Sequence, residues 1–348
     1  MPSISLKRVL PALALAVLLT GCASSHTGQP GDQRTLPAGR ETPAAQGSPS
    51  PSQGQQPVGG PVPLPEKLQM GADGLPMLAV YVKSASQIEE MPLEKYLQGV
   101  LAGEMKNDWP LEALKAQAIL ARTFVLKFLE EKESRYPNAD ISTDIEEAQA
   151  YDLAGVNDRV RQAVTETQGQ VLISDDGEFP FAWFHAHSGG ITALAKEGLE
   201  YENAEPPYTQ SVKGMESDQA PAEAAKWQAV FSAAEVMKAA ARLGARGERL
   251  SSIQVGQRGE SGRATTLVIN GSAVPAASFR IALGSTKMKS TLLDKVGLEN
   301  NQVTISGRGY GHGVGMSQWG AYGLAQQGKK ANEIAQYYFR GVRIERLW

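Results

Sequence analysis

A sharp change in composition near residue 65 separates a part of the chain that can bury a core from a part that cannot. From residue 23 to residue 65 the sequence is rich in Gly, Pro, Ser, Gln and Thr and has no aromatic residue. Such a segment cannot bury enough apolar surface to offset the entropy lost on ordering. We interpret residues 22–70 as a disordered linker and expect the folded unit over 71–348, with 222–300 as a candidate flanking subdomain.

The first 21 residues have the parts of a bacterial lipoprotein signal peptide. A basic pair at 7–8 precedes an apolar run at 9–19, and LTGC, which ends at Cys22, has the pattern of a lipobox. The apolar run is too short to remain as a membrane anchor. We therefore expect cleavage before Cys22, a lipid on Cys22, and an extracytoplasmic, membrane-anchored protein that faces the cell wall. An ordinary secretory signal with an incidental cysteine is the alternative.

Two segments have the apolar periodicity of helices. Residues 91–107 and 107–134 each carry a proline suited to a first helical turn, Pro92 and Pro110, and Asn107 or Asp108 is a candidate cap for the second helix. A third helical pattern covers residues 222–243.

Strand-like alternation appears at residues 75–84 and 175–187, and Asn270-Gly271 marks a hairpin turn between two further strands. Helices and strands do not follow a regular βαβ order. The predicted fold class is therefore α+β, with mixed helices and short antiparallel strands around a core with a substrate groove.

Charge and cysteine content exclude some classes of protein. The formal net charge is −3, and removing the two basic residues of the signal peptide makes it 32 − 37 = −5. This balance argues against binding to a phosphate backbone, so no nucleic-acid partner is expected. The single cysteine excludes an intramolecular disulfide.

One carboxylate stands at the end of an apolar helical stripe. Leu93, Leu97, Val100, Leu101 and Glu104 follow helical spacing, which places Glu104 on the apolar face. A desolvated carboxyl has a raised pKa and can donate a proton to a leaving oxygen. The alternative is a surface residue in the last helical turn whose carboxyl reaches solvent.

The histidines of the folded part lie in or beside Gly/Ser-rich loops. His185 and His187 would point to the same side of a strand, and with His312 they could form a three-histidine zinc site for amide hydrolysis. The alternative is hydrogen bonding or packing in a sugar-binding groove, and we predict no metal and no cofactor. Ser188 lies beside histidines but lacks the G-x-S-x-G pattern of a serine hydrolase.

The glycine-rich loop GRGYGHGVGMSQWG spans residues 307–320. It has neither the lysine of a P-loop nor the offsets of a dinucleotide-binding motif. Tyr310, His312, Ser317 and Gln318 present hydroxyl, imidazole and amide groups beside it. Such a mixture suits carbohydrate binding, and a structural turn between a strand and a helix is the alternative.

Six segments together resemble the stage II sporulation protein D/LytB family, and they occur in the family's order. They are LEKYLQGVLAGEM, WPLEALKAQAILARTFVL, FHAHSGGIT, SGRATTLVING, FRIALG and GRGYGHGVGMSQWGAYGLAQQG. The resemblance spans about residues 75–348. Its length and the number of its motifs make it much more specific than a single glycine loop.

The resemblance implies a peptidoglycan lytic transglycosylase, a carbon–oxygen lyase that cleaves between N-acetylmuramic acid and N-acetylglucosamine and forms a 1,6-anhydro ring. Its catalytic acid corresponds to Glu104. The family also contains amidase enhancers, so a wall-binding partner of an amidase without catalysis is the alternative. Peptidoglycan strands, and through the enhancers a cell-wall amidase, are the implied partners, and a sporulation role is also implied.

The other implied substrate-binding or supporting residues lie in three motifs. They are Gln117, Arg122 and Thr123 in the second helix; His185, Ser188, Gly189, Gly190 and Thr192 in and beside residues 188–190, which we call the SGG turn; and Tyr310, His312, Ser317 and Gln318 in the glycine-rich loop. Some family members bind zinc through a histidine and cysteines near this turn. His185 matches the histidine, but no cysteine is available and His187 stands where Ser, Thr or Cys is usual.

Overall fold

The computed structural model describes residues 62–348. The predicted signal peptide, Cys22 and the predicted linker up to residue 61 lie outside the described residues. The ordered fold begins before residue 71. Leu68 is buried, Val62 and Leu64 pack against the core, and β1 (Gln69–Met70) pairs with β2 (Pro76–Val82). The predicted linker end at residue 70 is therefore wrong, because these apolar side chains find a surface to cover.

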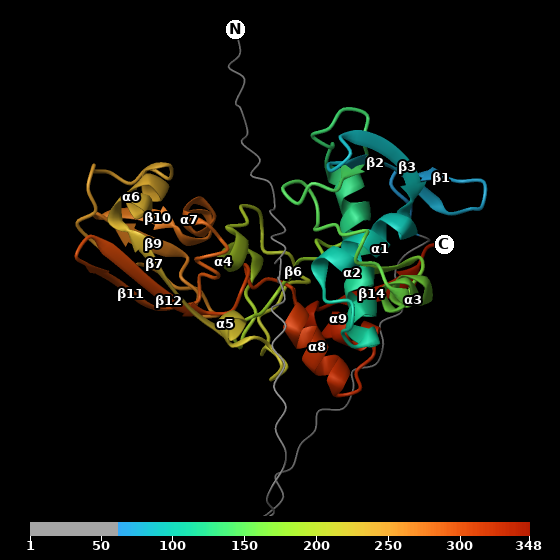
Figure 1. The fold of residues 1–348 in the computed structure, drawn as a ribbon. Helices are drawn as coiled ribbons and strands as arrows, with labels where there is room; N and C mark the ends of the chain where they lie inside the picture. The colour runs from blue at the N-terminus through green and yellow to red at the C-terminus, as the bar shows by residue number, and fades with distance from the viewer. Residues whose placement is uncertain (1–61) are drawn as a thin grey trace, which may run out of the picture.

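The larger hydrophobic core surrounds α2 (Leu111–Glu131), which is buried along most of its length. The elements that contact α2 are α1 (Leu93–Glu104), α3 (Asp158–Glu166), α8 (Gln318–Gln326), α9 (Ala331–Tyr338) and β5 (Gln170–Ser174). The final strand β14 (Val342–Arg346) pairs antiparallel with β5. Segments from both ends of the described chain thus meet around one helix (Figure 1).

A small sheet covers one end of this core. Strand β2 pairs antiparallel with β3 (Gln87–Pro92) and parallel with β4 (Ile141–Ser142). Neither α1 nor α2 has a side-chain cap, because prolines occupy both N-cap positions. Asn107, one of the two predicted caps, instead donates to the Gly155 carbonyl.

A second hydrophobic core lies in residues 226–308, which we call the second lobe; the rest of the described chain is the first lobe (Figure 1). Its elements are β7 (Lys226–Ser232), α6 (Ala233–Ala241), β8 (Ile253–Val255), β9 (Thr266–Ile269), β10 (Ser272–Pro275), α7 (Ala276–Leu283), β11 (Leu293–Glu299) and β12 (Gln302–Arg308). The hairpin turn at Asn270-Gly271 is confirmed, with positive φ at both residues.

The prediction of one or two helices over residues 222–243 is wrong in its middle. These residues form α5 (Ala222–Ala225), strand β7 and helix α6. Trp227 and Phe231 are buried on one face of β7, which pairs with β12 along its whole length. Burial of two aromatic side chains and a full ladder of backbone bonds thus overrides the helix preference of the neighbouring alanines.

Between the lobes, backbone segments pair over short lengths. Strand β6 (Phe184–His185) pairs parallel with β13 (Met316–Ser317), near the short helix α4 (Ala195–Leu199). The strand predicted over 175–187 is therefore wrong except at its last residues. The pairing of β6 with the glycine-rich segment is short because Gly311, Gly313 and Gly315 all have positive φ, which extended strands do not use.

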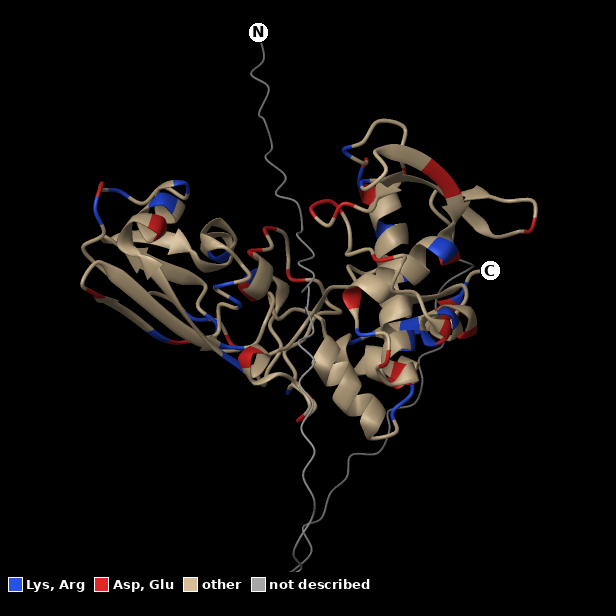
Figure 2. Cartoon of the chain, in the orientation of Figure 1, with Lys and Arg blue, Asp and Glu red and all other residues tan. Residues whose placement is uncertain are grey.

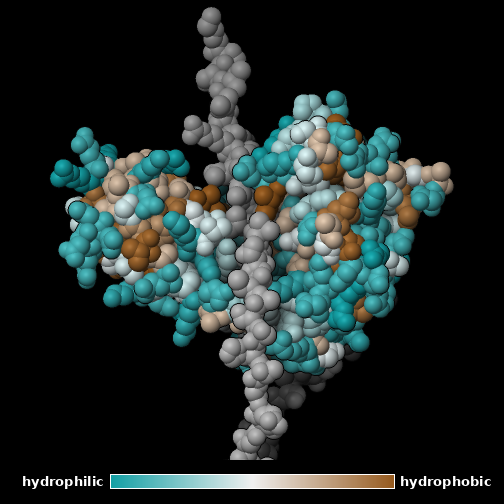
Figure 3. Space-filling view, in the orientation of Figure 1, coloured by the Kyte–Doolittle hydropathy of each residue, from teal (hydrophilic) through white to brown (hydrophobic). Residues whose placement is uncertain are grey.

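The surface carries charges of both signs over both lobes (Figure 2). The face seen in Figure 3 is mostly hydrophilic, with hydrophobic residues in small separate groups. Large exposed hydrophobic side chains of the described residues are Met70, Ile88, Leu153, Val230 and Ile281. Within residues 62–348 no helix has the length and apolar character needed to cross a membrane.

Candidate active site

Glu104 is the last residue of α1 and is half-buried. The preceding turns bury Leu97, Val100 and Leu101, so the carboxyl lies at the edge of the core, as its helical spacing predicts. Burial raises the pKa of Glu104 to about 7, and hydrogen bonds from Ala150 and Gln318 partly oppose this shift. Near neutral pH the group can therefore either give or accept a proton.

The two carboxyl oxygens of Glu104 have different surroundings. Oε1 accepts a hydrogen bond from the backbone N–H of Ala150 at 2.7 Å. Oε2 accepts no hydrogen bond of ordinary length within residues 62–348, although the nearby Gln318 amide helps to lower the pKa of the carboxyl, and Oε2 is not shut off from solvent. One oxygen is thus held in place while the other remains open to a ligand.

A close approach between α1 and the segment that follows β4 creates this hydrogen bond. A Cβ at Gly99 would lie only 2.3 Å from the Tyr151 ring, and the Gly99 carbonyl accepts from Asp152 N at 2.9 Å. Glycine at this position lets the segment lie directly on the helix. That contact places the Ala150 N–H beside Glu104.

The start of α8 supports Glu104 from the opposite end of the sequence. The side-chain amide of Gln318 donates to the Glu104 carbonyl at 3.1 Å. Ser317 caps α8 by accepting from Gly320 N, and its hydroxyl donates to Glu216 Oε1 at 3.1 Å. Two residues predicted from the glycine-rich loop, Ser317 and Gln318, therefore belong to the neighbourhood of Glu104.

Sequence reasoning missed Glu216. Its Oε1 also accepts from Ser188 N at 2.9 Å and lies 3.9 Å from His187 Nδ1, while its side chain is only 10% exposed. One carboxylate therefore joins the SGG turn to the start of α8. No motif contains this residue, and an isolated acidic residue in an irregular segment gives no periodic signal in the sequence.

The SGG turn and the glycine-rich loop lie side by side. His187 N donates to Tyr310 O at 3.0 Å, and Tyr310 N donates back to His187 O at 2.8 Å. Gly189 has positive φ, and a Cβ there would lie 2.9 Å from the Arg308 backbone. Gly190, also with positive φ, is exposed and donates to Ser188 Oγ.

The three histidines do not converge on one point. Among residues 62–348 no group of three or more His, Cys, Asp or Glu side chains is arranged to hold a metal ion. His185 and His312 lie 5.7 Å apart, edge to face, but His187 Nδ1 is occupied by Gly189 N. The three-histidine site considered as an alternative therefore does not form, and independence from a cofactor stays a prediction.

Burial keeps these imidazoles neutral. It is the main cause that lowers the pKa of His312 to about 3, and Arg280 and Arg263 lower it further. The same effect holds the pKa of His185 well below its usual range. His185 Nδ1 lies 3.1 Å from the Val314 carbonyl, and its Nε2 is buried without a partner. With Nδ1 as donor, Nε2 is left as an unused acceptor.

Four predicted substrate contacts are fully buried in the core. Arg122 pairs with Glu94 through two hydrogen bonds, at 2.7 and 3.0 Å, and Thr123 donates to Ile119 O. Thr192 donates to Gln210 O, and the amide of Gln117 has no hydrogen-bond partner within residues 62–348. None of the four is exposed, so they do not line an open groove in this structure, and their role as supports of the site stays a prediction. Their polarity follows from internal hydrogen bonds, except for Gln117, which nothing in the structure explains.

Arg263 joins the second lobe to this region. Its fully buried guanidinium donates to Ser188 O at 2.6 Å and to Ile191 O at 2.9 Å. Glu197 in α4 accepts from Arg263 N at 3.1 Å and from Ser261 Oγ at 2.6 Å. A turn of the second lobe therefore holds the SGG turn of the first.

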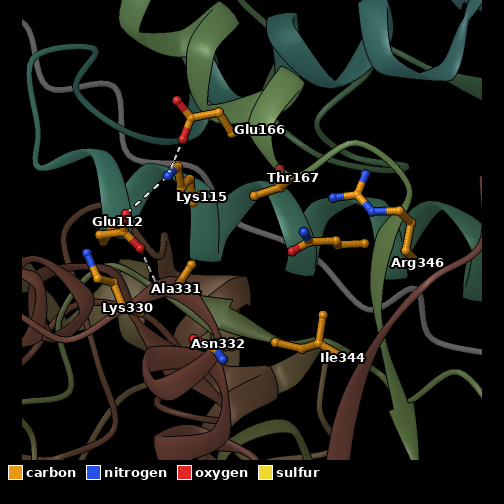
Figure 4. A pocket seen from close by; sticks show the side chains of 10 residues that line it. Glu112, Lys115, Glu166, Thr167, Lys330, Ala331, Asn332, Ile344 and Arg346 are labelled. Atoms are coloured by element: carbon orange, nitrogen blue, oxygen red, sulfur yellow. Dashed lines mark hydrogen bonds and ion pairs between the residues drawn. The ribbon is translucent and has the colours of Figure 1, made fainter.

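A cavity of about 420 Å³ lies elsewhere, between α2, α3, α9 and β14 (Figure 4). Lys115 crosses one wall and pairs with both Glu112 and Glu166. The complete lining is Glu112, Lys115, Glu166, Thr167, Gln170, Lys330, Ala331, Asn332, Ile344 and Arg346. No predicted site residue lines it, so the site around Glu104 is defined by its carboxyl and neighbouring loops.

Comparisons with known proteins give matches over much of the described chain. Residues 81–173 match a family described as stage II sporulation protein, and residues 194–315 match a domain of unknown function. Stage II sporulation protein D of Bacillus subtilis is 30% identical, over 77% of this chain and 78% of the relative. An uncharacterized protein of Brachyspira hyodysenteriae is 31% identical, over 77% of this chain and 70% of the relative. An amidase enhancer of Bacillus subtilis is 27% identical, over 71% of this chain and 40% of the relative.

Proposed function

The chain belongs to the stage II sporulation protein D family, and on that basis we propose that it acts on the cell wall as a peptidoglycan lytic transglycosylase. The observation that carries this proposal is the half-buried carboxyl of Glu104, whose pKa burial raises to about 7. A single carboxyl that titrates near neutral pH suits a reaction in which one group is first an acid and then a base.

In the proposed reaction, protonated Glu104 donates its proton to the oxygen of the bond between N-acetylmuramic acid and N-acetylglucosamine. The bond between muramic acid C1 and this oxygen breaks, and N-acetylglucosamine leaves with a free hydroxyl. The resulting carboxylate then accepts the proton of the muramic acid C6 hydroxyl, and the C6 oxygen bonds to C1 to close the 1,6-anhydro ring. Oε2 is the oxygen suited to this exchange, because Ala150 N occupies Oε1. No second carboxylate is required, unlike in most glycoside hydrolases.

We further propose that the exposed parts of the SGG turn and the glycine-rich loop contact the glycan strand. Ser317 and Gln318 would act mainly by holding Glu104, since Gln318 donates to its carbonyl and Ser317 caps α8. Lipid attachment at Cys22 and a membrane-anchored position outside the cytoplasm remain proposals from the sequence, as does a link to sporulation.

The second candidate is a wall-binding protein that stimulates an amidase without cleaving glycan. The similarity to a protein named amidase enhancer favours it. This candidate requires no chemistry at Glu104.

Mass spectrometry of products from purified peptidoglycan separates the two candidates. The wild-type protein should release fragments ending in 1,6-anhydro-muramic acid, and Glu104→Gln should release none while keeping its fold. Glycan left uncut by the wild type, together with stimulation of an added amidase, would favour the enhancer. Anhydro products from Glu104→Gln would remove Glu104 as the acid.

A further inference from the structure

The second lobe presents a buried cation to the glycine-rich loop. Arg280, on α7, is only 4% exposed. Its Nε donates to Lys289 O at 3.0 Å and its Nη2 donates to Ser285 O at 3.3 Å. Nη1 makes no hydrogen bond within residues 62–348, yet it is not among the side-chain atoms shut off from solvent. One edge of the guanidinium is therefore unused and reachable.

This cation lies directly beside the glycine-rich loop. The Lys289 carbonyl that accepts from Arg280 also accepts from Gly311 N at 2.9 Å. The ammonium of Lys289 lies 5.1 Å from the ring centre of Tyr310 and donates to the Glu223 carbonyl. Two cationic side chains thus flank Tyr310 on the loop that leads to Gln318 and Glu104.

No carboxylate of the described residues lies within ion-pair distance of either cation, although the Glu223 carboxylate is close enough to oppose in part the lowering of the Lys289 pKa by burial. A buried guanidinium without a counter-ion is costly, because desolvation disfavours its charged form. His312 adds no further positive charge, because burial and the two arginines lower its pKa to about 3 and keep the ring neutral. An anionic ligand would supply the missing partner.

We propose that Arg280 and Lys289 form a carboxylate-binding subsite for the glycan strand. This inference rests on the proposed function for its ligand. The planar guanidinium matches a carboxylate, and in the proposed subsite its free Nη1 and the Lys289 ammonium would each donate to the anion. Carboxylates on the strand come from two sources: the lactyl group of muramic acid where no peptide is attached, and the stem peptide where one is.

The experiment measures binding of purified glycan strands to the full chain carrying Glu104→Gln, so that strands are not consumed. Three ligands are compared: peptide-free strands, the same strands with carboxylates converted to methylamides, and strands with intact stem peptides. Lys289→Ala and Arg280→Lys test the subsite. Lys287→Ala, an exposed lysine of the same segment, is the matched control.

Lys289→Ala and Arg280→Lys should each weaken binding of carboxylate-bearing strands roughly tenfold, since a charged hydrogen bond is worth about that factor. Binding of methylamide strands should not change, and Lys287→Ala should behave as the parent. A loss confined to peptide-free strands identifies the lactyl carboxylate; a loss on peptide-bearing strands identifies the peptide.

Equal losses on the charged and the neutral strands would overturn the subsite, as would a parent protein that does not distinguish them. If Arg280→Lys fails to fold, Lys289→Ala decides alone. Carboxylate-dependent binding without anhydro products from the wild type would refute the transglycosylase and leave the subsite standing. Tight binding of methylamide strands together with anhydro products would refute the subsite and leave the transglycosylase standing.

Discussion

At the residue scale, the proposed chemistry depends on how the fold changes the pKa of one carboxyl group. The sequence predicts Glu104 on an apolar helix face, and the structure places it there half-buried. Of the partners that set its state, Ala150, 46 residues away, was not predicted, and Gln318, 214 residues away, was predicted only through the family resemblance. Glu216 was missed because its role arises only when three loops meet.

Glu104→Gln should stabilise the protein above neutral pH. The folded-state pKa is raised from the ordinary value of 4.5 to about 7. The folded protein therefore binds more protons than the unfolded chain between these values, and wild-type stability falls as pH rises through this window. The glutamine variant lacks this loss, so its advantage should be absent below about pH 4.5 and reach roughly 3 kcal/mol above pH 7.

Chemical denaturation at a series of pH values measures this difference. The exposed Glu202→Gln is the control, and its stability relative to the wild type should not change across the same range. A Glu104→Gln advantage that is independent of pH would show that the carboxyl is not desolvated in the folded state.

At the scale of elements, long periodic segments were predictable and irregular ones were not. The helices over 91–107 and 107–134 and the Asn270-Gly271 turn were found from local signals. Strand β7 was not, because its pairing with β12 depends on residues more than 70 positions away. The segment before the SGG turn alternates like a strand, but glycines in the partner loop limit its pairing to two residues.

Gly99→Ala should weaken both folding and activity, although alanine is the better helix former. The added methyl group would meet the Tyr151 ring at 2.3 Å and push the segment from α1. The Ala150 hydrogen bond to Glu104 would then lengthen, so activity should fall at least tenfold and the melting temperature should decrease. Gly297→Ala is the control, because a Cβ there meets nothing within 4 Å. Unchanged activity in Gly99→Ala would show that the segment does not position Glu104.

At the scale of the whole molecule, two hydrophobic cores meet through polar contacts at the SGG turn. Composition suggested a flanking subdomain at residues 222–300, and the second core draws its residues from Trp227 to Ile305. The joint could not be predicted, because it is built from hydrogen bonds between segments far apart in the sequence, among them two backbone carbonyls that accept from one buried arginine. Arg263 donates to the carbonyls of Ser188 and Ile191. The Glu197 carboxylate accepts a hydrogen bond from the backbone N–H of Arg263.

Arg263→Met should uncouple the two lobes. Removing the guanidinium leaves the Ser188 and Ile191 carbonyls without these donors, which should cost about 3 kcal/mol. Calorimetry should show one unfolding transition for the wild type and two for the variant, with the second lobe separate from the first. The exposed Arg242→Met is the control. A single transition in Arg263→Met, with unchanged midpoint, would show that the lobes are joined by other contacts.

The central claim is that the fold poises the Glu104 carboxyl near neutrality, and a direct titration tests it most simply. Carbon-13 NMR of the protein labelled at glutamate carboxyls, with Glu104→Gln to identify the signal, reports the ionisation of this group alone. We expect a midpoint near pH 7, in agreement with a pKa raised to about 7 by burial. A midpoint near the ordinary value of 4.5 would contradict it, because the carboxyl would then be ionised at neutral pH and unable to donate a proton.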